Sequence, residues 1–205
     1  MLRQVLPILL AAAVATAAHA QDDADGAAMM EKAAAVFEAT AAATCDPDGP
    51  GSEDSAPESH AIGFRYAYDA DEDPERTAWL FRFFCFSGAY NEIHVYYMSD
   101  DDGAVLPLHF AEPTYDVRYA GESDDTVEEI VMTGFSAAGQ LVNSAYDPAT
   151  RTITSNAQWR GLGDASSSGR WIFVEGGFRL VHYEVDASYD GEINPQVLVD
   201  YDTAP

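Results

Sequence analysis

The sequence is poor in positive charge. Its 205 residues carry 10 Lys and Arg against 35 Asp and Glu, which gives a formal net charge of −25 at pH 7. A surface of this sign repels nucleic acid and anionic lipid, so we expect neither as a partner. The acids cluster in short runs that are typical of solvated loops and chain ends, such as DDADG, DADEDPE, SDDDG and ESDD.

The sequence also lacks an apolar run long enough to span a membrane, which needs roughly 20 residues. Its apolar stretch from Val5 to about Ala18 follows one positive charge, Arg3, and closes with the small-x-small sequence AHA. This three-part pattern predicts a secretory signal peptide over residues 1–20, which is removed from the mature protein. We therefore expect an exported, periplasmic protein without membrane insertion. A membrane anchor is the alternative, and the shortness of the run argues against it.

Cysteine is scarce, since the chain has two, Cys45 and Cys85. An even number of cysteines in an exported protein favours a disulfide between them. Closing a loop of about 40 residues would stabilise the fold by roughly 4 kcal/mol on the chain-entropy model. Two buried free thiols are the alternative.

The length of the chain suits one domain. After a polar tail at 21–26, residues 27–45 are rich in Ala, Met and Glu and predict a helix. Residues 46–58, DPDGPGSEDSAPE, predict an exposed loop because they combine Pro, Gly and acids. Strand patterns follow. We predict that the signal peptide precedes an N-terminal helix and acidic loop over 21–60 and a β-rich domain over 61–205.

The chain after about residue 60 has the alternating pattern of β-strands. The segment AWLFRFFCF is aromatic on both faces and predicts a central strand that is covered on both sides. The segment TRTITSNAQW alternates cleanly, with Ile153, Ala157 and Trp159 on its apolar face. Further strands are predicted in IGFRYAY, NEIHVYYM, AVLPLHF, YDVRYA, VEEIVMTGF, QLVNSAY, RWIFV and FRLVHYEV. We expect an all-β fold of antiparallel sheets, blade-like or sandwich, with one N-terminal helix.

The stretch WRGLGDASSSGRW, residues 159–171, has the glycines and serines of a ligand-binding loop. A phosphate cradle needs the N-terminus of a following helix, and here a strand follows. We therefore interpret the stretch as a bend between two strands, whose glycines serve backbone geometry. Asp164 and Ser166–Ser168 are expected to carry no chemistry. Trp159 and Trp171 are expected to close over the sheet and stabilise it.

No catalytic residue and no cofactor is predicted. GFSAAG nearly matches the nucleophile elbow of hydrolases, but Ala138 replaces a glycine and a strand follows instead of a helix. A Ser-His-Asp triad is defined by geometry, so the sequence neither supports nor excludes one. The histidines after the predicted signal peptide show no metal-binding spacing; they are His60, His94, His109 and His182.

The acidic segment DADEDPE places carboxylates at every second position, as at the start of a calcium loop. Pro74 stands where such a loop needs its turning glycine, and no bidentate Glu follows at the usual spacing. A solvated acidic turn is therefore the favoured interpretation, and no metal is predicted. The weak metal candidates are Asp69, Asp71, Asp73 and Glu75.

Four segments occur in a characteristic order, FFCFSGAYNEIHVYY, LPLHF, LVNSAYDPATRTITSNAQWRGLGD and RWIFVEGGFRLVHYEV. Over residues 60–187 their pattern resembles the bacterial domain-of-unknown-function 1176 family. This resemblance implies an exported, envelope-associated protein for which no biochemical activity is established. The family usually has cysteine where this chain has Ala165 and Ala187, which implies that a second disulfide is missing. The motif residues, which we interpret as structural, are Gly88, Tyr90, Asn91, Gly161, Gly163 and Asp164.

A weaker resemblance links YDPATRTITS and the following W…GG.F.L hairpin to periplasmic inhibitors of lysozyme, as a fold-level analogy only. The favoured function is a non-enzymatic binding or interaction module whose partner is an unknown protein or envelope ligand. An inhibitor or immunity protein against a cell-wall hydrolase is the alternative. An envelope hydrolase with a dispersed site is the second alternative.

Overall fold

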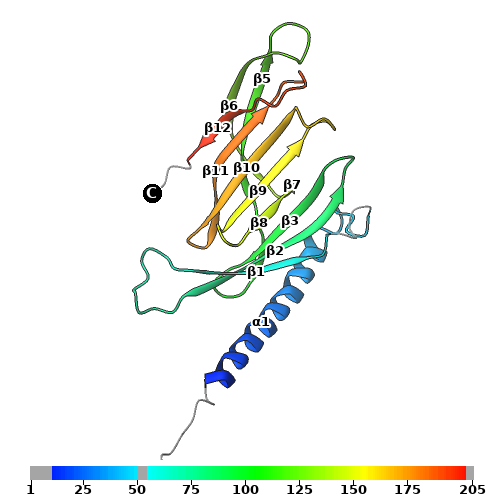
Figure 1. Ribbon diagram of the computed structural model, residues 1–205. Coiled ribbons are helices and arrows are strands. Elements are labelled where there is room, and N and C mark those ends of the chain that lie inside the picture. The colour runs from blue at the N-terminus through cyan, green and yellow to red at the C-terminus, as the bar shows by residue number, and fades with distance from the viewer. Residues whose placement is uncertain (1–10, 50–54, 202–205) are drawn as a thin grey trace, which may run out of the picture.

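The computed structural model describes residues 11–49 and 55–201, which form one helix and twelve strands in three antiparallel sheets (Figure 1). The predicted all-β class with one N-terminal helix is confirmed. Helix α1 spans Ala11–Thr40. Sheet A contains β1 (Glu58–Phe64), β2 (Arg76–Ser87), β3 (Glu92–Ser99), β4 (Val105–Pro107) and β7 (Leu141–Val142). Sheet B is the hairpin of β5 (Phe110–Tyr119) and β6 (Val127–Ala138). Sheet C contains β8 (Ala145–Asp147), β9 (Thr152–Gln158), β10 (Ser166–Val174), β11 (Gly177–Asp186) and β12 (Gln196–Asp200).

Strand β2 has a packed layer on each side, as its two aromatic faces predict. Phe81 and Phe83 face α1, and Phe37 of the helix stacks on Phe83 with ring centroids 4.8 Å apart. Ala78 and Leu80, on the other face, belong to the core between sheets A and C. The strand is therefore shared by two hydrophobic cores, which explains its nearly continuous apolar sequence.

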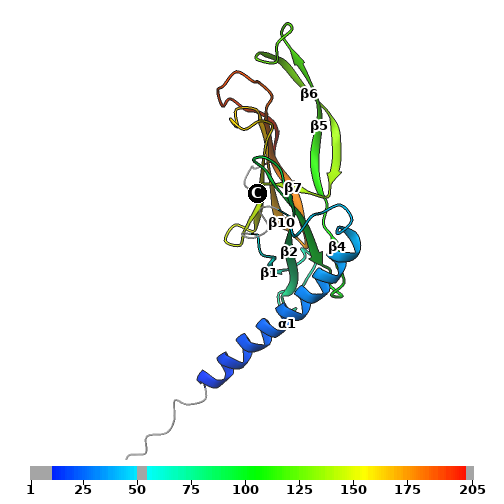
Figure 2. The same ribbon diagram turned by 90° about the vertical axis from the view of Figure 1, so that its right-hand side faces the viewer.

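Helix α1 begins and ends earlier than predicted. The segment 21–26, predicted to be a polar tail, is helical because helix-forming alanines flank it on both sides. The helix ends at Thr40 rather than near Cys45, in a turn where the amide of Thr44 donates to the carbonyl of Ala41 over 2.9 Å. Both views show the N-terminal part of the helix running out beyond the sheet (Figures 1 and 2).

The predicted signal peptide is only partly covered by the structure. Its residues 1–10 lie outside the described residues, and residues 11–20 are the first part of α1. No helix within the described ranges is long and apolar enough to cross a membrane.

The core between sheets A and C is centred on Trp171, which is fully buried. Its indole Nε1 donates to the carbonyl of Ala111 over 2.9 Å, and its ring contacts Phe110 with centroids 5.4 Å apart. The same ring lies directly over Gly169, where an added Cβ would come within 2.3 Å of the indole Cη2. Trp171 thus positions the start of β5 and requires a glycine beside it on β10.

The hairpin of sheet B forms a separate layer over the rest of sheet C (Figure 2). Ile130 of β6 packs with Tyr183, Val185 and Val199 of sheet C. The chain passes from sheet A to sheet C at one corner, where β7 pairs with β3 and β8 pairs with β9. Only Asn143 and Ser144 separate these two short strands, so the two sheets are held together at this point.

Candidate functional site

The two motif segments, 88–91 and 161–164, lie next to each other in the fold. The hydroxyl of Tyr90 donates to the backbone carbonyl of Trp159 over 3.1 Å. The Tyr90 ring also lies 3.6 Å from the position that a Cβ would take at Gly161. The motif therefore forms a junction between the β2–β3 turn of sheet A and the β9–β10 bend of sheet C.

The centre of this junction is the side-chain amide of Asn91. Its Nδ2 donates to the carbonyl of Gln158 over 2.8 Å, and its Oδ1 accepts the Nδ2 of Asn143 over 2.8 Å. Asn143 has a positive φ of 43° and exchanges two 2.7 Å hydrogen bonds with the backbone of Glu92. The turn is closed by the Gly88 amide, which donates to the carbonyl of Asn91 over 2.7 Å. The sequence places Asn143 in a predicted strand and not among the motif residues. The one sequence property that could have indicated its role is that Asn tolerates a left-handed backbone conformation.

Asp164 forms an ion pair with Arg160 inside the bend. Its side chain is almost fully buried and accepts two hydrogen bonds from the guanidinium of Arg160. The amide of Gly191 donates to the same carboxylate over 2.9 Å. The hydrogen bonds from Arg160 hold the pKa of Asp164 well below its usual range. Gly163 allows the bend with a φ of 74°. Both oxygens of the buried Asp164 carboxylate therefore have hydrogen-bond donors, as a buried charge requires.

Ser166–Ser168 belong to β10 and not to the bend, contrary to the sequence prediction. Ser166 pairs with Gln158 on β9 and with Asp186 on β11, so the bend is confined to residues 159–165. The hydrogen-bond ladders on both sides of β10 override the low strand preference of serine and glycine.

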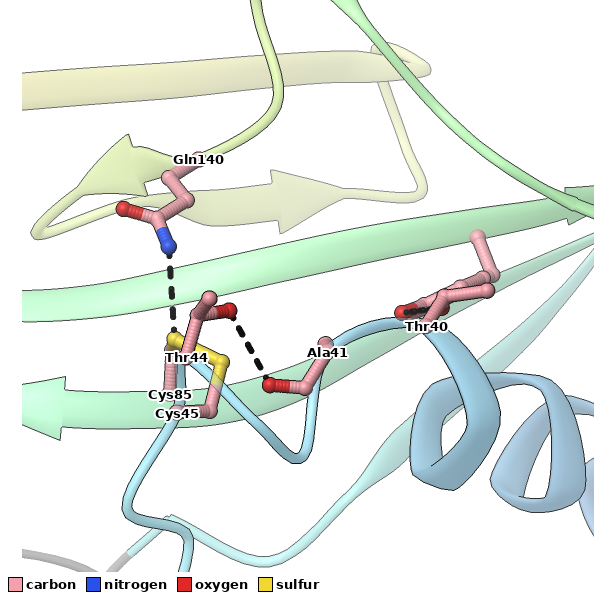
Figure 3. The surroundings of a disulfide bond; sticks show 7 residues. Thr40, Ala41, Thr44, Cys45, Cys85 and Gln140 are labelled. Atoms are coloured by element: carbon pink, nitrogen blue, oxygen red, sulfur yellow. Dashed lines mark hydrogen bonds between the residues drawn. A yellow bond between two sulfur atoms is a disulfide. The ribbon is translucent and has the colours of Figure 1, made fainter.

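The structure has the predicted disulfide between Cys45 and Cys85 (Figure 3). It joins the turn after α1 to β2, where Cys85 is fully buried. The side-chain amide of Gln140 lies beside it, 3.5 Å from Cys85 Sγ. Ala165 and Ala187, where the family resemblance implied a missing second disulfide, are both buried.

The four acidic metal candidates do not converge. Asp69 accepts the Tyr66 amide over 2.9 Å and pairs with Arg76 at 3.2 Å. Asp73 accepts the amide of Ala70 over 2.9 Å, whereas Asp71 and Glu75 are exposed. Across residues 11–49 and 55–201, no three His, Cys, Asp or Glu side chains gather as a metal site would require.

The near-match to a nucleophile elbow lies in a strand, because Ser136 is part of β6 and faces Glu112 in register. The four histidines are dispersed over β1, β3, the β4–β5 connection and β11. His94 is the most buried of them, and burial lowers its pKa to about 4. Within the described chain, no hydrogen bond joins a serine or cysteine to a histidine.

A cleft of about 440 Å³ lies where β1, β2, β3 and the β4 region meet the tip of the β10–β11 hairpin. Its apolar lining includes Phe64, Ala78, Met98 and Leu108. Leu106, also in the lining, is 56% exposed. An apolar floor that is open to solvent is the usual form of a ligand site.

The rim of this cleft combines carboxylates with aromatic rings. Asp100, Asp101 and Asp102 form the β3–β4 turn at one side. The Tyr66 ring lies on the same rim and stacks on Tyr68 with centroids 5.0 Å apart and an interplanar angle of 9°. Burial is the main cause that raises the pKa of Tyr66. Arg76 lies over the Tyr66 ring, 5.1 Å from its centroid.

The aromatic wall is held in place by the tip of the β10–β11 hairpin. Glu175 and Gly176 both have positive φ, 48° and 81°, as in the tight hairpin turns that match strand twist. Glu175 Oε1 accepts the amide of Ala67 over 2.9 Å. A Cβ at Gly176 would come within 3.1 Å of the Tyr66 hydroxyl, so glycine allows this close approach. This cleft has no signature in the sequence, because its walls come from four separate segments.

A family model described as "Protein of unknown function (DUF1176)" matches residues 73–192. The match includes the Asn91 junction and the cleft lining from Ala78 to Gly176, whereas Phe64 and Tyr66 lie before it. No curated protein and no solved structure matches the chain. The weaker resemblance to lysozyme inhibitors is not confirmed and stays a prediction.

Proposed function

The chain belongs to the DUF1176 family, whose description assigns no activity, and from its own structure we propose that it is an exported, periplasmic binding protein with its ligand site in the cleft. The observation that carries this proposal is the cleft itself. It combines an apolar floor, an exposed Leu106 and the ring of Tyr66, on which the exposed Tyr68 stacks. Exposed apolar and aromatic groups of this kind mark binding surfaces.

Export is supported by two independent features of the chain. The first is the secretory pattern over residues 1–20. The second is the Cys45–Cys85 disulfide, which persists in oxidising compartments such as the periplasm.

A non-enzymatic role is supported by the way the cleft uses its polar groups. The hydroxyl of Ser99 accepts the backbone amide of Trp79 over 2.9 Å. Asp100 accepts the amides of Asp102 and Ala104 over 3.0 and 2.8 Å and so fixes the turn. Asp101 pairs with Arg76 at 2.9 Å. The described lining holds no His, Cys or Lys that would activate a nucleophile.

The experiment is site-specific photo-crosslinking in the native envelope. A benzoylphenylalanine replaces Leu106 inside the cleft, and in a matched control it replaces Val131, which is 37% exposed on β6. A binding protein of the proposed kind gives a defined crosslinked product from position 106 and none from position 131. Products of equal yield from both positions, or none from either, would contradict the proposal. If the product is a cell-wall hydrolase, a lysis assay with the purified protein then tests the inhibitor alternative.

A further inference from the structure

We infer that the occupant of the cleft is an extended basic peptide segment of another protein, with a cationic side chain at the acidic rim and an apolar side chain on the floor. This inference rests on the proposed function, because it names the ligand of the same cleft. It is carried by three features: the charge of the rim, the way the fold already binds one guanidinium there, and the edge of β4 with which no described strand pairs.

The rim is strongly negative. Asp100, Asp101 and Asp102 are consecutive and exposed, and no ion pair within the described chain engages Asp102. The whole chain adds a field of the same sign, with a net charge of −25. Low-dielectric apolar walls beside charges of one sign concentrate ligands of the opposite sign. The ligand therefore carries positive charge.

Arg76 shows how this rim binds a guanidinium. Its side chain lies between Asp69, at 3.2 Å, and Asp101, at 2.9 Å, and over the face of Tyr66. Carboxylates at the sides and an aromatic face below are the arrangement that favours Arg or Lys. Tyr68 stacks on Tyr66 and is 77% exposed, which extends the aromatic surface for a second cation.

The floor and the strand edge favour a peptide over a small amine. Met98, Leu106 and Leu108 offer apolar contacts that a polyamine would leave unused. β4 is the last strand in the path β1-β2-β3-β4, and within the described residues no strand pairs with its other edge. An extended chain adds to a sheet edge through backbone hydrogen bonds and places alternate side chains in adjoining pockets. A peptide with alternating basic and apolar residues meets all three requirements.

The test is fluorescence anisotropy with the full mature protein and three labelled hexapeptides. One alternates Arg and Leu, one alternates Arg and Ser, and one alternates Glu and Leu. We expect the Arg-Leu peptide to bind about tenfold more tightly than the Arg-Ser peptide, because only the first fills the floor. The Glu-Leu peptide is expected not to bind, because the rim repels it.

Two matched pairs of variants separate the cleft from the overall charge. Asp101→Asn with Asp102→Asn is expected to weaken Arg-Leu binding about tenfold at physiological salt. Asp116→Asn with Glu122→Gln removes the same charge from exposed positions of β5 and of the β5–β6 turn and is expected to change binding less than about twofold. Leu106→Ser is expected to weaken binding, and Val131→Ser is expected not to. Far-ultraviolet circular dichroism and a melting curve confirm that each variant is folded.

The results that would contradict the basic-peptide ligand differ from those that would contradict the proposed function. Equal losses in both charge variants would show that the net charge alone attracts the peptide and would overturn the inference. Equal affinity for the Arg-Leu and Arg-Ser peptides, or complete displacement by stoichiometric spermine, would also overturn it. If no peptide binds but position 106 still crosslinks, the proposed function stands and the basic-peptide ligand is wrong.

Discussion

The side-chain amide of Asn91 donates to the backbone carbonyl of Gln158 over 2.8 Å, across 67 positions of sequence. Asn91 lies in the turn between β2 and β3, and Gln158 is the last residue of β9. Their bond therefore ties sheet A to sheet C. The Gln158 amide donates back to Asn91 Oδ1 over 3.2 Å, so one side chain imitates the pairing of a neighbouring strand.

Replacing Asn91→Ala is expected to lower the free energy of unfolding by about 1–3 kcal/mol, since it leaves half-buried donors and acceptors of Asn143 and Gln158 without partners. The urea midpoint of the purified protein measures the loss. Asp116→Ala, at an exposed position of β5, is the control and should change stability by less than about 0.5 kcal/mol. Equal midpoints for Asn91→Ala and the wild type would show that the junction does not hold the sheets together.

Gly169→Ala is expected to destabilise the protein by about 1–3 kcal/mol, because the new methyl group would overlap the Trp171 ring. Gly177→Ala is the matched control on the neighbouring strand. A Cβ at Gly177 would meet no atom within 4 Å, so its effect should stay within about 0.5 kcal/mol. Thermal melting of both variants makes the comparison. A Gly169→Ala variant as stable as the wild type would mean that the indole moves freely.

Replacing each of the two tryptophans at the ends of the bend with alanine is expected to lower the free energy of unfolding by different amounts. Trp171→Ala should cost about 3–5 kcal/mol, because it empties the centre of a core. Trp159 lies beyond the end of β9 and is only half-buried, so Trp159→Ala should cost roughly 1–2 kcal/mol. The sequence predicts that both tryptophans close over the sheet, and the half-burial of Trp159 leads us to expect a smaller loss from its substitution than from that of Trp171. Denaturant unfolding measures the loss of unfolding free energy in each variant. A larger loss for Trp159→Ala than for Trp171→Ala would contradict the prediction.

His94 is expected to make the fold sensitive to acid. Its folded-state pKa of about 4 lies below the ordinary 6.5, because burial and the charge of Arg82 disfavour the protonated ring. The unfolded chain therefore takes up this proton first as the pH falls. The contribution of a neutral His94 is fully present above pH 6.5 and is lost between pH 6.5 and about 4, on the order of 3 kcal/mol in total.

The measurement for His94 compares wild type with His94→Phe in urea at several pH values through this window. The difference in unfolding free energy between the two proteins isolates the histidine from the many carboxylates that titrate alongside it. We expect the wild type to lose more stability than the variant as the pH falls. Parallel pH profiles would show that His94 is not buried as a neutral ring.

The parts of the fold that the sequence predicts well are those in which local pattern and burial agree. The two aromatic faces of AWLFRFFCF require cover on both sides, and β2 has it. The turn at residues 147–150 is also determined locally, since Asp147 accepts the amide of Ala149 over 2.9 Å and the hydroxyl of Thr150 over 2.8 Å. Both features depend on residues that are close in sequence.

The parts that were missed depend on contacts between distant segments. Ser166–Ser168 are a strand because β9 and β11 supply hydrogen bonds on both sides. β12 is short and begins after a loop, and only its pairing with β11 makes it a strand. Asn143 is an ordinary polar residue in sequence, and its role depends on Asn91 being nearby in space. The cleft is likewise invisible in sequence, because four separate segments supply its walls.

The disulfide determines what happens when the polypeptide chain is cleaved by a protease. Cys45 and Cys85 enclose β1 and the connection before β2, whose residues 70–75 are exposed. A protease that hydrolyses one peptide bond in this connection produces two fragments that stay covalently joined. The nicked molecule migrates as one species on a gel until a reductant is added. A single proteolytic cut at this rim of the cleft therefore leaves α1 and β1 attached to the rest of the protein.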